Sequence, residues 1–198
     1  MVNRYSKHDM YLRRLELQGF KTFAKKTVLE FVPDAAGRRG VTGIVGPNGS
    51  GKSNIADALR WVMGEQSMKL LRSKKSEDVI FSGTNKRSRS GFAEVTMIIE
   101  REDTWESKNQ KSNIKTDEIL NLDSSTFDTY QAEIAITRRL YRDGNSEYEV
   151  NRQAARLQDV TLLLAQCGIG QRSYSVIGQG MIDHVLMEYH LQLTVIRE

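Results

Sequence analysis

One short stretch combines glycines, a lysine and a serine at a spacing that suits phosphate binding. Residues 46–53 read G-P-N-G-S-G-K-S, a full match to the P-loop pattern G-x-x-x-x-G-K-[ST]. The three glycines let the backbone turn tightly and bring its N–H groups against phosphate oxygens, where a Cβ would crowd them. The Lys52 amine can reach the β- and γ-phosphates, and the Ser53 hydroxyl suits Mg²⁺. The stretch therefore predicts a site for ATP or a similar nucleoside triphosphate.

Two predicted elements flank this stretch and would hold it in place. Val41 to Val45 is a short apolar run typical of a buried strand. After the loop, apolar residues recur with helical spacing, and Gly64 is a suitable stop for the helix. These apolar residues are Ile55, Leu59, Val62 and Met63. Because a helix that begins here would point free N–H groups at the phosphates, we favour a phosphate site over a chance glycine-rich turn.

The composition is typical of a globular chain that forms one domain or one lobe of a larger one. The 198 residues are 39% apolar and 27% charged. No apolar run approaches the roughly 18 residues that span a bilayer, and residues 1–9 contain no secretory segment. The single cysteine, Cys167, excludes an internal disulfide framework and is expected to be a small buried residue on a helix. We expect a cytoplasmic protein without a membrane partner.

Positive charge is concentrated in the first half of the chain. Residues 1–90 carry 18 Lys and Arg against 8 Asp and Glu, a net +10, whereas residues 91–198 carry 11 against 17, a net −6. A basic half fits a surface that faces DNA, but a solvated positive face without a partner fits the charge equally well. The candidate DNA contacts are Lys74, Lys75, Lys86, Arg87 and Arg89.

Alternating residues predict strands on both sides of the P-loop. The strands are expected over 11–17, 27–31, 93–100, 133–141, 147–151 and 174–177, with an Asp-Gly hairpin turn at 142–146. An apolar stripe through Leu157 and Leu164 predicts a helix that stops at Gly168. Residues 1–9 are expected to be a disordered extension. Residues 101–131 are polar and without a period, which favours a surface insertion.

Four blocks of the sequence together resemble the N-terminal head segment of structural maintenance of chromosomes (SMC) proteins, closest to the bacterial condensin type. The blocks are G-F-K-T-F-A at 19–24, G-P-N-G-S-G-K-S-N at 46–54, R-W-V-M-G-E-Q-S at 60–67 and Y-S-V-I-G-Q-G at 174–180. SMC heads are ABC-type ATPases. The resemblance therefore implies an α/β fold (an α+β mixed sheet), with residues 10–198 as the N-terminal lobe of such a head.

The resemblance also implies a role for each matching residue. ATP and Mg²⁺ would be held by the P-loop residues Gly46, Pro47, Asn48, Gly49, Ser50, Gly51, Lys52, Ser53 and Asn54. Gln179 would complete the Mg²⁺ shell beside Ser53 and position water. Lys21 and Thr22 would lie near the base and ribose. Arg72 falls where bacterial members carry an arginine implicated in hydrolysis, close to the γ-phosphate, so that Lys52, Gln179 and Arg72 form the catalytic set.

Plainer interpretations of three of these residues stay open. Gln179, between two glycines, also fits an ordinary turn. Arg72 and Lys21 each stand among other lysines, so a solvated basic surface also fits them.

Two parts of a complete ABC head are missing from the sequence. There is no Ser-Gly-Gly signature stretch, and no apolar strand ends in the Asp-Glu pair that activates water. Residues 98–100 read I-I-E, but their period-two alternation marks a strand end. The sequence stops where the SMC coiled coil would begin, so we expect a truncated chain, a broken reading frame or an incomplete gene. The isolated chain is expected to have little or no ATPase activity.

The favoured interpretation is an ATP-binding head fragment of a chromosome condensation and segregation ATPase, which organises DNA through ATP-driven head dimerisation. The resemblance implies double-stranded DNA, the protein's own C-terminal head lobe, a second copy joined through heads and hinge, and kleisin-type subunits as partners. It also implies association with the nucleoid. Two alternatives stay open: the head of a related coiled-coil DNA-repair or recombination ATPase, and a non-catalytic fragment that only contacts DNA or a partner.

Overall fold

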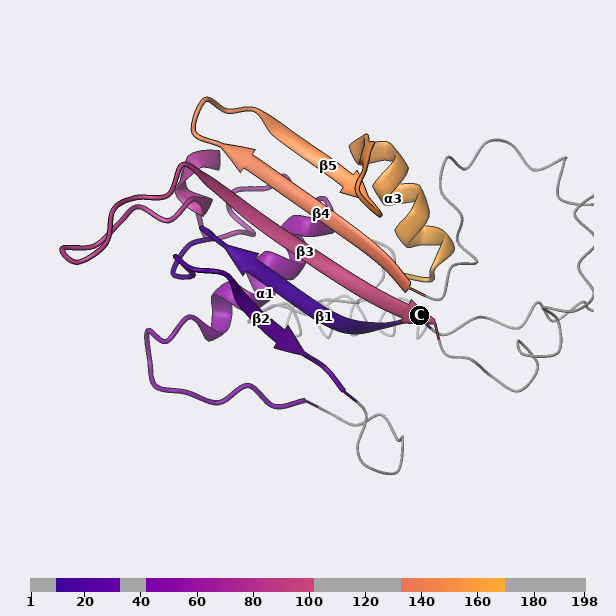
Figure 1. Ribbon diagram of the computed structural model, residues 1–198, viewed down its shortest axis with the longest axis horizontal. Coiled ribbons are helices and arrows are strands. Elements are labelled where there is room, and N and C mark those ends of the chain that lie inside the picture. The colour runs from indigo at the N-terminus through magenta and orange to yellow at the C-terminus, as the bar shows by residue number, and fades with distance from the viewer. Residues whose placement is uncertain (1–9, 33–41, 102–132, 170–198) are drawn as a thin grey trace, which may run out of the picture.

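The computed structural model describes residues 10–32, 42–101 and 133–169. Six strands form one sheet in the order β2-β1-β3-β4-β5-β6, and all its neighbouring strands are antiparallel (Figure 1). The strands are β1 Met10–Gln18, β2 Thr27–Glu30, β3 Phe92–Arg101, β4 Glu133–Tyr141, β5 Ser146–Val150 and β6 Gln153–Ala155. The first five confirm predicted strands; β6 was not predicted, because three residues are too few to show a period.

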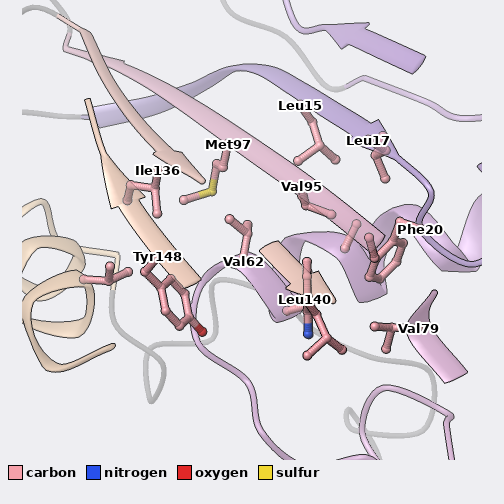
Figure 2. Packing of buried hydrophobic residues seen from close by; sticks show 14 of the residues in the cluster. Leu15, Leu17, Phe20, Val62, Val79, Val95, Met97, Ile136, Leu140 and Tyr148 are labelled. Atoms are coloured by element: carbon pink, nitrogen blue, oxygen red, sulfur yellow. The ribbon is translucent and has the colours of Figure 1, made fainter. Parts of the chain in front are cut away.

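The sheet has one apolar face and one polar face, as the alternation predicts. The pairing of β1, β3, β4 and β5 aligns one row of apolar residues, Leu15, Met97, Ile136 and Val150. Figure 2 shows side chains of this face, which belong to the hydrophobic core. The neighbouring row is polar, and within it Thr96 and Thr137 form a 2.9 Å hydrogen bond between their hydroxyls. Such a sheet buries one face and leaves the other for solvent.

Within the described residues, two α-helices and one short 3₁₀ helix accompany the sheet. They are α1 Lys52–Val62, η1 Ser76–Val79 and α3 Leu157–Gln166. α1 lies behind the sheet in Figure 1 and packs against β3 and β4, while α3 packs against β5. Both helices stop at the predicted glycines: Gly64 (φ +104°) donates to the Trp61 carbonyl, and Gly168 (φ +75°) donates to that of Ala165. Cys167, next to that stop, is half-buried, and burial raises the pKa of its thiol.

A tight turn after β1 brings the G-F-K-T-F block against the segment that contains η1. Gly19 has φ +63°, and a Cβ there would stand 2.2 Å from the carbonyl oxygen of Phe92. The turn is tied by two backbone hydrogen bonds, from Lys21 to Val79 and from Phe81 to Gly19, each 2.7 Å long. Glycine is needed at position 19 for this turn to form, and the turn places Lys21 beside Val79.

The strand predicted over 41–45 is wrong for the part that the structure describes. Residues 42–47 have no regular secondary structure, and the side chains of Ile44 and Val45 are 45% and 96% exposed. An extended segment becomes a strand only where another strand bonds to its backbone. Within the described residues, all the strands of the sheet pair with each other instead. The extension 1–9, nearly all of the insertion 101–131, and residues 174–180 lie outside the described residues.

Candidate nucleotide site

The P-loop leads directly into α1, with Gly51 as the residue before the helix. Gly51 has φ +93° and Gly49 has φ +79°, a region that residues with a Cβ rarely adopt. A Cβ on Gly51 would also stand 2.7 Å from the Thr22 hydroxyl oxygen, and one on Gly46 2.9 Å from that of Ser50. Backbone geometry therefore favours glycine at positions 49 and 51, in agreement with the predicted tight turn.

The Lys52 side chain folds back over the loop instead of pointing away from it. Its amine donates to the carbonyl oxygens of Gly46 and Pro47, at 2.5 and 2.7 Å. These are the first two residues of the P-loop pattern, so the positive charge lies across the loop. The next residue, Ser53, is exposed in the first turn of α1. The first N–H groups of a helix have no acceptor within it, and they add to the positive potential here.

These residues fit a nucleoside triphosphate with its magnesium ion. A cation, bare glycine backbone and a helix start converge on one exposed loop, which is the donor set that polyphosphate requires. The part of the chain that the structure describes holds no cluster of three or more His, Cys, Asp or Glu that could bind a metal by itself. Ser53 stays a predicted Mg²⁺ ligand, together with phosphate oxygens. The other predicted ligand, Gln179, lies outside the described residues.

A buried carboxylate, Asp57, organises the side of α1 next to the P-loop. Asp57 is 1% exposed, so its carboxyl group needs polar partners within the fold. The Lys21 amine lies 2.5 Å from its Oδ2, and that amine also donates to the carbonyl of Leu71. Arg72 places Nη2 2.6 Å from the same Oδ2 and Nε 3.3 Å from Oδ1. One carboxylate therefore binds two of the cationic residues to which the resemblance gives a role, Lys21 and Arg72.

Side chains link this cluster to the P-loop. Nη2 of Arg72 donates to Oδ1 of Asn54 at 3.2 Å, and Nδ2 of Asn54 donates to the Thr22 hydroxyl at 3.0 Å. The structure thus brings Lys21, Thr22, Asn54 and Arg72 together at the start of α1. The Lys21 amine is directed at Asp57 and Leu71; its place near the base and ribose, and that of Thr22, stay predictions.

Asp57 was not predicted as a site residue, although the sequence contains a signal for it. The residue stands on the helix face that also carries Ile55, Ala58, Trp61 and Val62, all buried. A lone carboxylate on an apolar face requires a buried cationic partner, because an unpaired buried charge is very unfavourable. The sequence pattern thus predicts cationic partners for Asp57, but it does not identify them as Lys21 and Arg72.

A comparison with protein-family models matches residues 11–179 to the RecF/RecN/SMC N terminal domain. The chain belongs to this family. Its curated relatives include the chromosome partition protein Smc of Mycobacterium leprae, 48% identical over 177 residues, which are 89% of this chain and 12% of that protein. The SMC chain thus spans about an eighth of the length of such relatives.

Solved structures agree with this SMC assignment. A chain from work on ATP-driven dimerization and DNA-stimulated activation of SMC ATPases has a TM-score of 0.69 at 30% identity, covering 94% of this chain and 99% of that one. The Smc head domain of Pyrococcus furiosus, bound to the C-terminal domain of ScpA, has a TM-score of 0.68 at 32% identity, covering 89% of this chain and 38% of that one. The recombination mediator RecF shares the fold alone, at 20% identity and a TM-score of 0.50. The SMC chain therefore has the fold of an SMC head, of which it forms the N-terminal part.

Other surface features of the SMC chain bear on partners. The five candidate DNA contacts, Lys74, Lys75, Lys86, Arg87 and Arg89, are all exposed. Among the described residues, no helix combines the length and apolar character needed to cross a bilayer. Arg13 and the Tyr11 hydroxyl both contact the Glu100 carboxylate, which agrees with a strand end there and not with a catalytic pair.

Proposed function

We propose that this chain binds Mg-ATP as the N-terminal lobe of the ATPase head of a chromosome-partitioning SMC protein. The observation that supports the proposal is the position of the Lys52 amine across the P-loop, within 2.7 Å of the Gly46 and Pro47 carbonyls. Phosphate oxygens would replace those carbonyls as acceptors, since a charged acceptor makes the stronger hydrogen bond. Family membership and the shared head fold make the SMC assignment preferable to a repair ATPase.

In this proposal, catalysis depends on positioning and on charge neutralisation. Lys52 and the amides at the start of α1 hold the β- and γ-phosphates, and the Ser53 hydroxyl binds Mg²⁺. Arg72 lies at the edge of the P-loop through Asn54 and adds positive charge near the terminal phosphate. Gln179 would position water. Bound Mg-ATP supplies the phosphoanhydride bond whose cleavage drives the heads apart.

The proposal includes a second lobe that completes the head. The exposed apolar side chains of Ile44 and Val45 lie directly before the P-loop, and a strand from a C-terminal head lobe would cover them. That lobe would also supply the missing acidic pair. Further partners are a second head across the nucleotide, kleisin-type subunits and double-stranded DNA, with the nucleoid as the location. ATP-driven dimerization and ScpA binding are described for the similar SMC structures.

The first test is Mg-ATP binding by this chain, measured by calorimetry. Lys52→Ala should weaken binding by about tenfold or more, because a charge-assisted contact to phosphate is lost. Lys69→Ala is the matched control, since Lys69 is an exposed lysine outside the loop, and it should bind as the unmodified chain does. No binding at millimolar Mg-ATP would contradict the proposal and favour a fragment that only contacts DNA or a partner.

The second test is hydrolysis after this chain is combined with a matching C-terminal head lobe. Phosphate release should appear in the mixture and not with either part alone. The activity should be lost with Lys52→Ala. If hydrolysis does not appear, or survives that substitution, the assigned roles are wrong.

A further inference from the structure

Asp57 has one more cationic partner than its own charge requires. Its side chain is 2% exposed, and the Lys21 side chain beside it is 10% exposed. A carboxylate this deeply buried must be paired to stay ionised at acceptable cost. Lys21 fulfils that need alone, because its amine lies between Oδ2 of Asp57 and the carbonyl of Leu71 and is held on both sides. With Arg72 included, the cluster carries a net charge of +1.

Arg72 carries that surplus charge in a strained and specific position. Its φ of +51° is in the left-handed region, which is unfavourable for a side chain with a Cβ and persists only where contacts enforce it. Those contacts are the fork of Nε and Nη2 on Asp57 and the 3.2 Å bond to Asn54. The Arg72 side chain remains 50% exposed. The Arg72 guanidinium is therefore held by Asp57 and by Asn54, and its other side faces solvent.

We propose that Asp57 is a positioning residue, which aims the charge of Arg72 at the terminal phosphate of the bound nucleotide while Lys21 serves as its permanent counter-ion. This inference rests on the proposed function. A triphosphate carries more negative charge than a diphosphate, so a fixed surplus cation at the edge of the P-loop favours ATP over ADP. Asp57 itself touches no phosphate in this scheme and acts through Arg72.

The test measures the ratio of the ADP and ATP dissociation constants, with Mg²⁺, by calorimetry on the full 198-residue chain. The unmodified chain should prefer ATP. Arg72→Ala should lower the ratio by about tenfold, and Asp57→Asn should lower it to a similar extent. The double variant should lower the ratio no further than Arg72→Ala alone does, because the two residues act as one unit.

Three results would overturn the inference. In the first, Asp57→Asn weakens ATP and ADP equally and leaves the ratio unchanged, as a purely structural residue would. In the second, the effects of Asp57→Asn and Arg72→Ala on the ratio add in the double variant. In the third, Arg72→Ala does not change the ratio. Failure of the unmodified chain to bind Mg-ATP would instead contradict the proposed function, so the two failures are distinguishable.

A second variant keeps the test valid if Asp57→Asn does not fold. Combining Lys21→Met with Asp57→Leu replaces the buried ion pair by apolar side chains, which is often neutral for stability. Arg72 is then intact but without its carboxylate. This variant should lower the ratio of the ADP and ATP dissociation constants as Arg72→Ala does; an unchanged ratio would show that Arg72 does not need Asp57.

Discussion

The guanidinium of Arg138 lies over the indole ring of Trp61, 4.6 Å from the ring centroid, and its Nη1 donates a 2.8 Å hydrogen bond to the carbonyl of the same tryptophan. The same nitrogen donates to the Glu65 carbonyl at 3.0 Å. These acceptors lie at and just beyond the C-terminal end of α1, where the helix dipole favours a cation. Arg138, from β4, thus fastens the far end of the P-loop helix to the sheet.

We predict that Arg138→Met lowers the free energy of unfolding by about 2 kcal/mol, because two charge-assisted hydrogen bonds and a cation–π contact are lost. The loss is limited, since the variant no longer buries a guanidinium. That burial is already unfavourable: it lowers the pKa of Arg138. Urea unfolding followed by circular dichroism measures the change.

The matched control is Arg139→Met, one residue along the same strand and on the opposite face of the sheet. Arg139 pairs with Glu94 and Glu149 on the polar face, at 2.5 and 3.1 Å. Partly exposed pairs of this kind contribute only about 0–1 kcal/mol. If both variants lose the same stability, Arg138 has no special role at the helix end.

The stability of the chain should also fall at high pH because of Tyr148. Burial raises the pKa of its hydroxyl from 10 to about 12, against an opposing effect of Arg138. Between these values the unfolded chain loses the phenol proton and the folded chain keeps it. The folded state therefore becomes less stable as pH rises from 10 through 12, by about 3 kcal/mol in total. Unfolding midpoints in urea across this range measure the slope.

Tyr148→Phe is the variant that isolates this effect. Within the described residues the Tyr148 hydroxyl is buried and has no hydrogen-bond partner, and Figure 2 shows its position among the apolar side chains of the core. Its removal should change stability at pH 7 by less than about 1 kcal/mol and flatten the slope between pH 10 and 12. An equally steep slope in the variant would assign the pH dependence to other groups.

Local sequence patterns predicted most of this fold, because the period of the apolar residues shows which face a β-strand or an amphipathic helix buries. The alternation in 93–100 and the stripe from Ile55 to Met63 both became elements of the expected type. Contacts between side chains that are far apart in the sequence leave no local pattern. Asp57 lies 36 residues from Lys21 and 15 from Arg72, and only the folded chain shows that one carboxylate binds both. Apolar content alone misassigned 41–45, since a strand also needs a neighbour.

The turn that places Lys21 depends on a glycine at position 19. Gly19→Ala should destabilise the chain by more than about 3 kcal/mol, because it combines a left-handed backbone with a Cβ 2.2 Å from the Phe92 carbonyl oxygen. Gly144→Ala is the control: φ is +89° there, but nothing lies within 4 Å of the added Cβ. That variant should cost only about 1–2 kcal/mol of backbone strain. Equal losses would show that the close approach to Phe92 is relieved at little cost.

The basic loop before β3 is the first candidate surface for DNA. Lys86, Arg87 and Arg89 are exposed there, and Figure 1 shows the loop extending beyond the sheet. If these side chains contact phosphates, each contact contributes about 0.9 to the slope of log K against log salt concentration. Changing all three to Ala should therefore weaken binding to duplex DNA and make the salt dependence shallower by about two to three units.

The control removes the same amount of charge elsewhere. Lys25, Lys26 and Arg152 are also exposed, and they lie in the turns between β1 and β2 and between β5 and β6. A contribution from net charge alone would weaken both triple variants equally, because long-range attraction depends on total charge. If the slope of log K against log salt concentration becomes shallower in the loop variant and not in the control, the phosphate contacts lie at the loop. An unchanged slope in the loop variant would show that DNA binds elsewhere on the chain or not at all.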